Sequence, residues 1–207
     1  MKNIDIVFVT GNEGKRREIE VLINDKIKDI KINLLSLKDV NFTEEIEETG
    51  DTCEENAKIK AMEVFERLNM PCIADDSGLF VDYLNGAPGV HTAIYAGTNS
   101  TPDACMDKLL TELEGVPDEK RTAHFKCVLC CVLGKEDDRI FYSKGICDGV
   151  VLKEKVGDKG FGYDPIFFYP PAMKSFAELT VEEKNKYSHR AIAVEHFAKN
   201  IVKYINI

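Results

Sequence analysis

Apolar and polar residues along the chain follow the periods of strands and helices in turn. The apolar run at 4–9 predicts a short buried strand, and Ile19, Leu22 and Ile23 recur at helical spacing directly after it. Between residues 52 and 68, apolar residues recur along one face of a longer helix. The first half is therefore expected to contain strands at 4–9, 30–35, 72–76 and 79–84 and helices at 15–23 and 52–68.

The second half predicts a pair of neighbouring strands followed by helices. Apolar runs at 123–133 and 139–144 are separated by Gly134–Asp138, which is typical of a hairpin. Strands that alternate with helices and then form a hairpin indicate a mixed sheet, so we expect an α/β protein with one compact domain, 1–207. The remaining expected features are turns at Ser77–Gly78 and Asn85–Gly89, helices at 103–113 and 188–204, and a capping box at Thr180–Glu183.

Composition and charge narrow the class of protein. The chain is 44% apolar and 30% charged, which is enough for a packed core and excludes a disordered chain. No stretch approaches the ~18 uninterrupted apolar residues of a membrane helix, and the first ten residues lack a signal peptide, so a cytoplasmic protein without a membrane partner is expected. A net charge of −9 argues against a nucleic-acid partner but allows a local cationic pocket for a small anion.

Seven cysteines raise the question of a metal or redox site. Cys127 and Cys130 have the spacing of half a zinc site, but no second pair of cysteines or histidines follows at ligand spacing. Both lie in the apolar run 123–133, where a free cysteine behaves as a small hydrophobic residue. We therefore predict that the cysteines pack in the core.

The segment Thr10–Lys15 could bind phosphate. It lies between a predicted strand and a predicted helix, where glycine backbone amides, a helix N-terminus and a lysine all favour an anion. The spacing is not that of a Walker P-loop. Glycines at such a turn also occur for steric reasons alone, so this cluster by itself leaves both interpretations open.

Two acidic segments could hold a cation. Glu44–Glu48 is followed by a predicted helix, and most of its carboxylates are expected on a solvated loop, with one or two as metal ligands. Asp75 and Asp76 end an apolar strand, where a carboxylate must be solvated, paired or bound to a cation. Strand alternation sends neighbouring side chains to opposite faces, so only one of the two should face a given site; the alternative is an Asx turn.

A fourth cluster, late in the chain, combines aromatic and cationic residues. Gly160–Asp164 could offer aromatic faces for a base to stack on, although Phe161 and Tyr163 could equally be core residues. Ser188–Arg190 begins a predicted helix, where a capping serine, a histidine and an arginine favour an anion. Together the four clusters indicate a nucleotide polyphosphate with a divalent cation.

These motifs, in this order, resemble those of the inosine/xanthosine triphosphate pyrophosphatases. The resemblance runs from Ile4 to about Tyr204 and rests on Thr10–Lys15, Asp75–Leu79, Gly86–Gly89, Phe161–Pro165 and Ser188–Arg190. It implies Mg²⁺-dependent hydrolysis of ITP, dITP and XTP to the monophosphate and pyrophosphate, by a homodimer. It also implies a long mixed β-sheet with flanking helices, in two lobes around a central cleft.

The resemblance also implies roles for individual residues. Asp76 would be the general base and a metal ligand, with Glu47 as a second metal ligand. Ser77 would lie beside the substrate, and Lys60 would contact phosphate. The full set expected to bind substrate is Thr10, Gly11, Asn12, Glu13, Gly14, Lys15, Lys60, Ser77, Phe161, Gly162, Tyr163, Asp164, Lys184, His189 and Arg190.

The chain departs from the family pattern at two positions. Cys53 stands where relatives often carry an aromatic residue, which we interpret as a packing change, and Ile94 stands where a basic residue is usual. The loss of that charge bears on substrate affinity or on a dimer contact. Two other functions remain open: a Maf-like pyrophosphatase for modified pyrimidine nucleotides, and a nucleotide-binding regulator without turnover.

Overall fold

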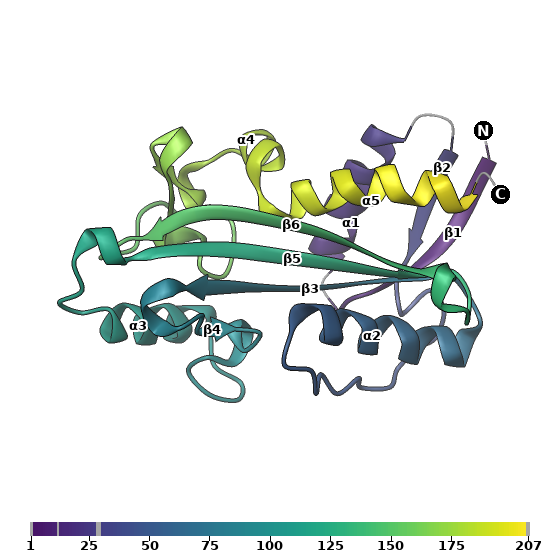
Figure 1. Ribbon diagram of the computed structural model, residues 1–207, viewed down its shortest axis with the longest axis horizontal. Helices are drawn as coiled ribbons and strands as arrows, with labels where there is room; N and C mark the ends of the chain where they lie inside the picture. The colour runs from purple at the N-terminus through teal and green to yellow at the C-terminus, as the bar shows by residue number, and fades with distance from the viewer. Residues whose placement is uncertain (1, 12, 28–29, 206–207) are drawn as a thin grey trace. The chain divides into compact units, whose positions relative to one another are not determined.

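The computed structural model describes residues 2–11, 13–27 and 30–205, without the side chains of 2, 13, 14 and 205. Strands and helices alternate through α3, and two longer strands then lead into the C-terminal elements (Figure 1). The elements are β1 Lys2–Val9, α1 Glu13–Lys26, β2 Ile30–Leu35, α2 Cys53–Leu68, β3 Cys72–Val81, β4 Pro88–Gly89, α3 Pro102–Glu112, β5 Thr122–Val132, β6 Ile140–Val151, β7 Phe167–Tyr169, β8 Lys174–Ser175, α4 Val181–Tyr187 and α5 His189–Ile205.

The described strands form one mixed sheet. Its order is β2-β1-β3-β5-β6-β7-β8, with β4 paired to β3. β1 runs parallel to β2 and to β3, whereas β4 is antiparallel to β3 and β7 is antiparallel to β6 and β8. The α/β class and the mixed sheet predicted from the sequence are therefore confirmed.

The chain divides into two compact units by its internal contacts. Unit 1 comprises Met1–Asp76, Cys127–Gly145 and Arg190–Ile207, and unit 2 comprises Ser77–Lys126 and Ile146–His189. The two units agree in number with the two lobes that the resemblance implies. The expected cleft and the single domain 1–207 stay predictions.

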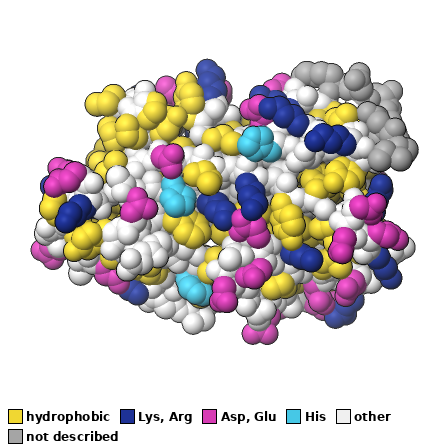
Figure 2. All heavy atoms as spheres, viewed as in Figure 1, with side chains coloured by type: hydrophobic (Ala, Val, Ile, Leu, Met, Phe, Trp, Pro, Cys, Tyr) yellow, Lys and Arg dark blue, Asp and Glu magenta, His cyan; other side chains and the backbone are white. Residues whose placement is uncertain are grey.

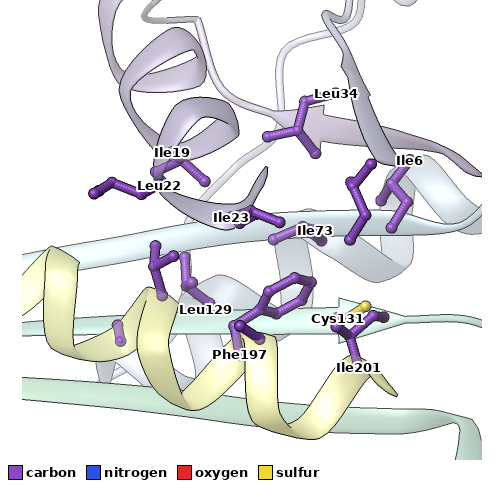
Figure 3. Close-up of a cluster of buried hydrophobic side chains, with 14 of the residues drawn as sticks. Ile6, Ile19, Leu22, Ile23, Leu34, Ile73, Leu129, Cys131, Phe197 and Ile201 are labelled. Atoms are coloured by element: carbon purple, nitrogen blue, oxygen red, sulfur yellow. The ribbon is translucent and has the colours of Figure 1, made fainter. Parts of the chain in front are cut away.

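In unit 1, α1 and α5 cover one face of the strands and α2 covers the other (Figure 1). Side chains of α1 and α5 meet strand residues in one apolar cluster, where Ile19, Ile73 and Phe197 are fully buried (Figure 3). The cluster also includes Cys127 and Cys131, which are fully buried. The cysteines therefore pack in the core, as predicted, and the described residues contain no group of three potential metal ligands.

Unit 2 has its own core, rich in aromatic rings. The Phe125 ring lies 4.5 Å from that of Phe167 and 5.8 Å from that of Phe176, centroid to centroid. Buried apolar residues of α3, among them Leu109, belong to the same cluster. Fully buried Phe side chains each contribute about 2–3 kcal/mol of transfer free energy, so this core holds the C-terminal loops in place.

Hydrogen-bonding residues fix where the helices begin. Thr52 and Glu55 form a capping box at the start of α2, and Thr180 and Glu183 form the box predicted for α4. Thr101 accepts a hydrogen bond from the backbone of α3, whose first residue is Pro102. These are local signals, which explains why the sequence predicted the helix boundaries closely.

The turn predicted at Ser77–Gly78 is wrong. β3 continues without a break from Cys72 to Val81, and Gly78 lies inside it. A Cβ atom on Gly78 would lie 2.3 Å from the carbonyl oxygen of Gly89 in β4. The glycine is thus required by the close approach of the β4 backbone. Because the chain does not turn here, the alternative interpretation of Asp75 and Asp76 as an Asx turn is also wrong.

The second strand of the predicted hairpin is longer than expected. β6 runs on from Ile140 to Val151, seven residues beyond the predicted end at Lys144. Alternate residues of β6 are buried on one face, which is the strand period. Gly145 and Gly149 interrupt the alternation of apolar and polar residues, so the sequence does not predict this part of the strand. Gly149 is required here because a Cβ atom would lie 2.5 Å from the Phe167 ring.

Acidic and basic side chains are interspersed over the face drawn in Figure 2, where neither sign forms a broad patch. This distribution is consistent with the net charge of −9 and differs from the wide basic surface that nucleic-acid-binding proteins present. None of the described helices has the length and apolar character needed to cross a bilayer.

Candidate active site

The adjacent carboxylates Asp75 and Asp76 lie in the middle of β3, and each engages a different lysine. Both are buried, with 3% and 8% of their surface exposed. Successive strand residues point to opposite faces, so Asp75 binds Lys15 and Asp76 binds Lys60. The prediction that only one of the two faces a given site agrees with this arrangement.

Asp75 is held as an anion by two cations of unit 1. The Lys15 Nζ, from the first turn of α1, lies 2.8 Å from Asp75 Oδ2. Burial by itself would raise the pKa of Asp75, but the positive charges of Lys15 and Arg190 outweigh it and hold that pKa below its ordinary value. Arg190 is itself 1% exposed and lies 3.6 Å from Glu18 Oε2.

Asp76 shares Lys60 with an acidic residue of the preceding loop. The Lys60 Nζ lies 3.1 Å from Asp76 Oδ1 and 2.8 Å from Glu48 Oε2. The lysine comes from the second turn of α2, which the Thr52 capping box anchors directly after the loop. Burial lowers the pKa of Lys60, but the charges of Asp76 and Glu48 outweigh it and raise that pKa overall.

One oxygen of the Asp76 carboxylate is available to bind a further group. Its Oδ2 is buried and accepts no hydrogen bond within the described part of the chain. Burial raises its pKa, and the charge of Lys60 only partly opposes this. An unpartnered buried carboxylate oxygen is costly unless a cation or a proton donor binds it, so the residue fits a hard divalent cation.

Sequence reasoning singled out Glu47 in the acidic segment, whereas the structure brings Glu48 next to Lys60. Both residues are exposed, and Glu48 accepts the 2.8 Å hydrogen bond from Lys60 described above. A run of consecutive acids shows no helical or strand period, so the sequence holds no signal that selects one of them. The selection comes from where α2 presents Lys60.

The Cys53 substitution reaches this site. Cys53 is buried at the start of α2. Burial raises the pKa of Asp76, and Lys60 and the nearby Cys53 thiol partly oppose this. The interpretation of Cys53 as a packing change stays a prediction.

The predicted phosphate segment joins β1 to α1. Thr10 directly follows β1, Gly11 is exposed with open space where a Cβ would be, and Glu13 and Gly14 begin α1. Asn12 lies outside the described residues. The strand–turn–helix context expected of an anion-binding segment is thus present around Lys15.

In unit 2, a buried ion pair supports an exposed aromatic ring. Lys184 Nζ lies 2.5 Å from Asp164 Oδ2, and both side chains are nearly inaccessible. The same Asp164 oxygen accepts a hydrogen bond from the backbone of Phe161, whose ring is half exposed and lies 4.8 Å from Lys184 Nζ. The ion pair thus holds in place the loop that carries the half-exposed Phe161 ring.

Gly160 is required by this arrangement, although sequence reasoning did not assign it a site role. It has a φ of +78°, and a Cβ would lie 2.1 Å from Asp164 Oδ2. Gly162, with a φ of +61°, has open space around it. The loop therefore needs glycine backbone on both sides of Phe161.

Tyr163, another predicted residue of this loop, lies in the core. Tyr163 is 3% exposed, and its hydroxyl donates to the Thr92 carbonyl oxygen over 2.9 Å. The core alternative that the sequence left open for Tyr163 therefore describes its position, while Phe161 is the aromatic residue that faces outward.

The predicted residues around the start of α5 are buried. His189 is 4% exposed, and its ring stacks on Phe125 with centroids 4.8 Å apart. Ser188 is fully buried and ends α4 directly before α5. Ser77, which follows Asp76 in β3, has an Oγ without a hydrogen-bond partner among the described residues.

Comparisons with known proteins agree with these observations. The Ham1 family profile matches residues 6–200. Two curated relatives, both called dITP/XTP pyrophosphatase, are 47% identical over 198 residues in Christiangramia forsetii and 44% identical over 195 residues in Bacillus subtilis. The matches cover 96% and 94% of this chain and 99% and 96% of the relatives.

A solved structure shares the fold. The HAM1 protein of Coxiella burnetii superposes with a TM-score of 0.87 at 36% identity, over 97% of this chain and 99% of its own. A family match over nearly the whole chain and relatives of this identity decide the classification. This chain belongs to the Ham1 family.

Proposed function

We propose that this protein is a nucleoside-triphosphate pyrophosphatase that hydrolyses dITP, ITP and XTP to the monophosphate and pyrophosphate. The observation that carries the proposal is the Asp76–Lys60–Glu48 cluster, with its unpartnered buried carboxylate oxygen, in a member of the Ham1 family. The substrate class follows from relatives named dITP/XTP pyrophosphatase at 42–47% identity.

In this proposal, Asp76 accepts the proton of the attacking water. Burial raises the pKa of its carboxylate above the ordinary value, although the charge of Lys60 opposes this, and a raised pKa makes the carboxylate a stronger base. The water attacks the α-phosphorus, and pyrophosphate leaves. Lys15, Lys60 and Arg190 supply positive charge that stabilises the charge developing on the phosphate oxygens.

A divalent cation fits the same cluster, and we propose Mg²⁺. Asp76 would hold it through the unpartnered Oδ2. The second ligand is Glu47 by family resemblance and Glu48 by geometry, because Glu48 shares Lys60 with Asp76. The ion would supply neutralisation of the substrate's phosphate charge.

Base recognition is proposed for residues of unit 2. The half-exposed Phe161 ring would stack on the purine, and Lys184 beside it would donate a hydrogen bond to the 6-oxo group. An adenine carries a 6-amino donor there, which leaves the lysine unpaired and disfavours ATP. His189 and Arg190 stay predicted contacts.

The reaction is tested with purified protein and Mg²⁺ on dITP, XTP, ITP, ATP, GTP and modified pyrimidine triphosphates. We expect pyrophosphate and monophosphate from the first three at kcat/KM values about 100-fold above those for ATP. Release of orthophosphate would contradict attack at the α-phosphorus. Preference for modified pyrimidines would indicate the Maf-like alternative, and binding without turnover would indicate a regulator.

Variants of the carboxylates test the assignments. Asp76→Asn is expected to lower kcat about 10³-fold, because the base and a metal ligand are lost together. We expect Glu48→Gln to lower kcat/KM about 100-fold and to raise the Mg²⁺ concentration needed for half-maximal activity, while Glu47→Gln stays within about threefold. The reverse order would assign the ligand to Glu47.

The homodimer is proposed from the resemblance, and the cytoplasmic location is proposed from the apolar pattern of the sequence. Sedimentation equilibrium tests the former, since a dimer has twice the 23.3 kDa mass of the chain.

A further inference from the structure

Lys60 occupies the position between the two carboxylates that geometry favours as metal ligands. Its ammonium is within hydrogen-bond distance of Glu48 Oε2 and Asp76 Oδ1 at the same time. Only 13% of the lysine side chain is exposed. A single ammonium thus provides the positive charge shared by Glu48 and Asp76.

This arrangement is electrostatically incompatible with a divalent cation at the same two carboxylates. A cation bound to Glu48 and Asp76 would lie within a few ångströms of Lys60 Nζ, and positive charges at that separation repel each other. The repulsion is strongest on the side of buried Asp76, since the Glu48 side chain is 44% exposed. The ammonium must therefore leave at least one carboxylate when such an ion binds. The unpartnered Asp76 Oδ2 is the oxygen through which the ion can first attach.

We propose that Lys60 is the resting counter-ion of the metal site, which a divalent cation displaces and which then becomes available to the nucleotide's phosphates. The inference rests on the proposed function for the existence of the metal site. It adds that Lys60 alternates between two partners, the carboxylates before metal binding and phosphate oxygens after it.

Two consequences follow for binding. Without nucleotide, Lys60 weakens metal binding, because the ion must compete with it for Glu48 and Asp76. With nucleotide bound, the displaced ammonium gains phosphate partners, so metal and nucleotide strengthen each other's binding. If Lys60 served only to orient the carboxylates, its removal would instead weaken metal binding or leave it unchanged.

The experiment measures Mn²⁺ binding to the nucleotide-free protein by titration calorimetry. We expect Lys60→Met to bind Mn²⁺ about tenfold more tightly than the wild type, since the competing charge is gone. Lys60→Arg keeps that charge and should stay within about twofold of the wild type. Lys58→Met is the matched control, because it removes the same charge from an exposed position of the same helix, and it too should stay within about twofold.

A stability measurement covers the case in which the Met variant folds poorly. Mn²⁺ should raise the Tm of Lys60→Met, or of the more polar Lys60→Gln, more than it raises that of the wild type at equal concentration. Equal or weaker Mn²⁺ binding in both neutral variants overturns the proposal, as does failure of both to bind Mn²⁺. If the wild-type protein still hydrolyses dITP in that case, the proposed function stands without the exchange.

Discussion

Asp75 and Asp76 show how one residue step along a strand separates two roles. Asp75 binds Lys15 and keeps a pKa below its ordinary value, whereas burial raises the pKa of Asp76 above it. The difference lies in how many cations surround each carboxylate. Asp75 therefore serves as a fixed anion that orients Lys15, and Asp76 is the group available for chemistry.

Replacing Asp75 tests this division at the residue scale. Asp75→Asn should lower the free energy of unfolding by about 2 kcal/mol, because it removes the buried anion that pairs with the partly exposed Lys15. Urea denaturation at neutral pH measures the change. Asp5→Asn, the same substitution at an exposed position of β1, is the control and should change stability by less than ~0.5 kcal/mol. Equal stability of the two variants would contradict the anchoring role.

Helix boundaries at the element scale follow local chemistry. The capping boxes at Thr52 and Thr180 and the N-terminal proline of α3 involve residues at most three positions apart, so the sequence alone predicted where these helices begin. Strand ends do not follow local chemistry in the same way. Gly78 suggested a turn because glycine is common in turns, but its position in β3 depends on Gly89, eleven residues further on.

A substitution at Gly78 tests the contact between β3 and β4. Gly78→Ala is expected to lower the free energy of unfolding by about 3 kcal/mol, because the added methyl group would overlap the Gly89 carbonyl and force β4 to move. Thermal unfolding followed by circular dichroism measures the loss. Gly97→Ala is the comparison, since it adds a methyl group in open space at a φ of +122° and should cost about 1 kcal/mol. A smaller loss at Gly78 than at Gly97 would show that β4 adapts without cost.

At the scale of the whole molecule, net charge favours binding of small anions over binding of nucleic acids. The net charge of −9 coexists with a few cations in sites where each is paired with a carboxylate, as Lys15, Lys60 and Lys184 are. Such cations can act on a small anion at short range, whereas they cannot attract a long polyanion against the surrounding negative field.

We therefore expect the protein not to bind duplex DNA. Fluorescence polarisation with a fluorescein-labelled duplex of ~20 base pairs should show no binding at ~150 mM salt with up to ~100 µM protein. Binding of unlabelled dITP is measured in parallel by calorimetry as the positive control. The Asp76→Asn variant is used for this measurement because it is expected to hydrolyse the nucleotide only slowly. Duplex binding that weakens steeply with added salt would contradict the expectation.

The sequence by itself determined the features that depend on neighbours along the chain. These are the helices, their caps, the apolar strands, the burial of Cys127 and Cys130, and the presence of acids at β3 beside a strand–turn–helix segment with a lysine. Hydrophobic period and capping chemistry act over a few residues, so they can be recognised without the fold.

Only the tertiary structure decided which of these residues meet. It paired Asp75 with Lys15 and Asp76 with Lys60, brought Glu48 to the latter, and left Phe161 outward while Tyr163 was buried. Each choice depends on which face of a strand or loop an element packed from elsewhere in the sequence covers. That packing is a property of the assembled core, where side chains up to 60 positions apart come within 2.8 Å of each other.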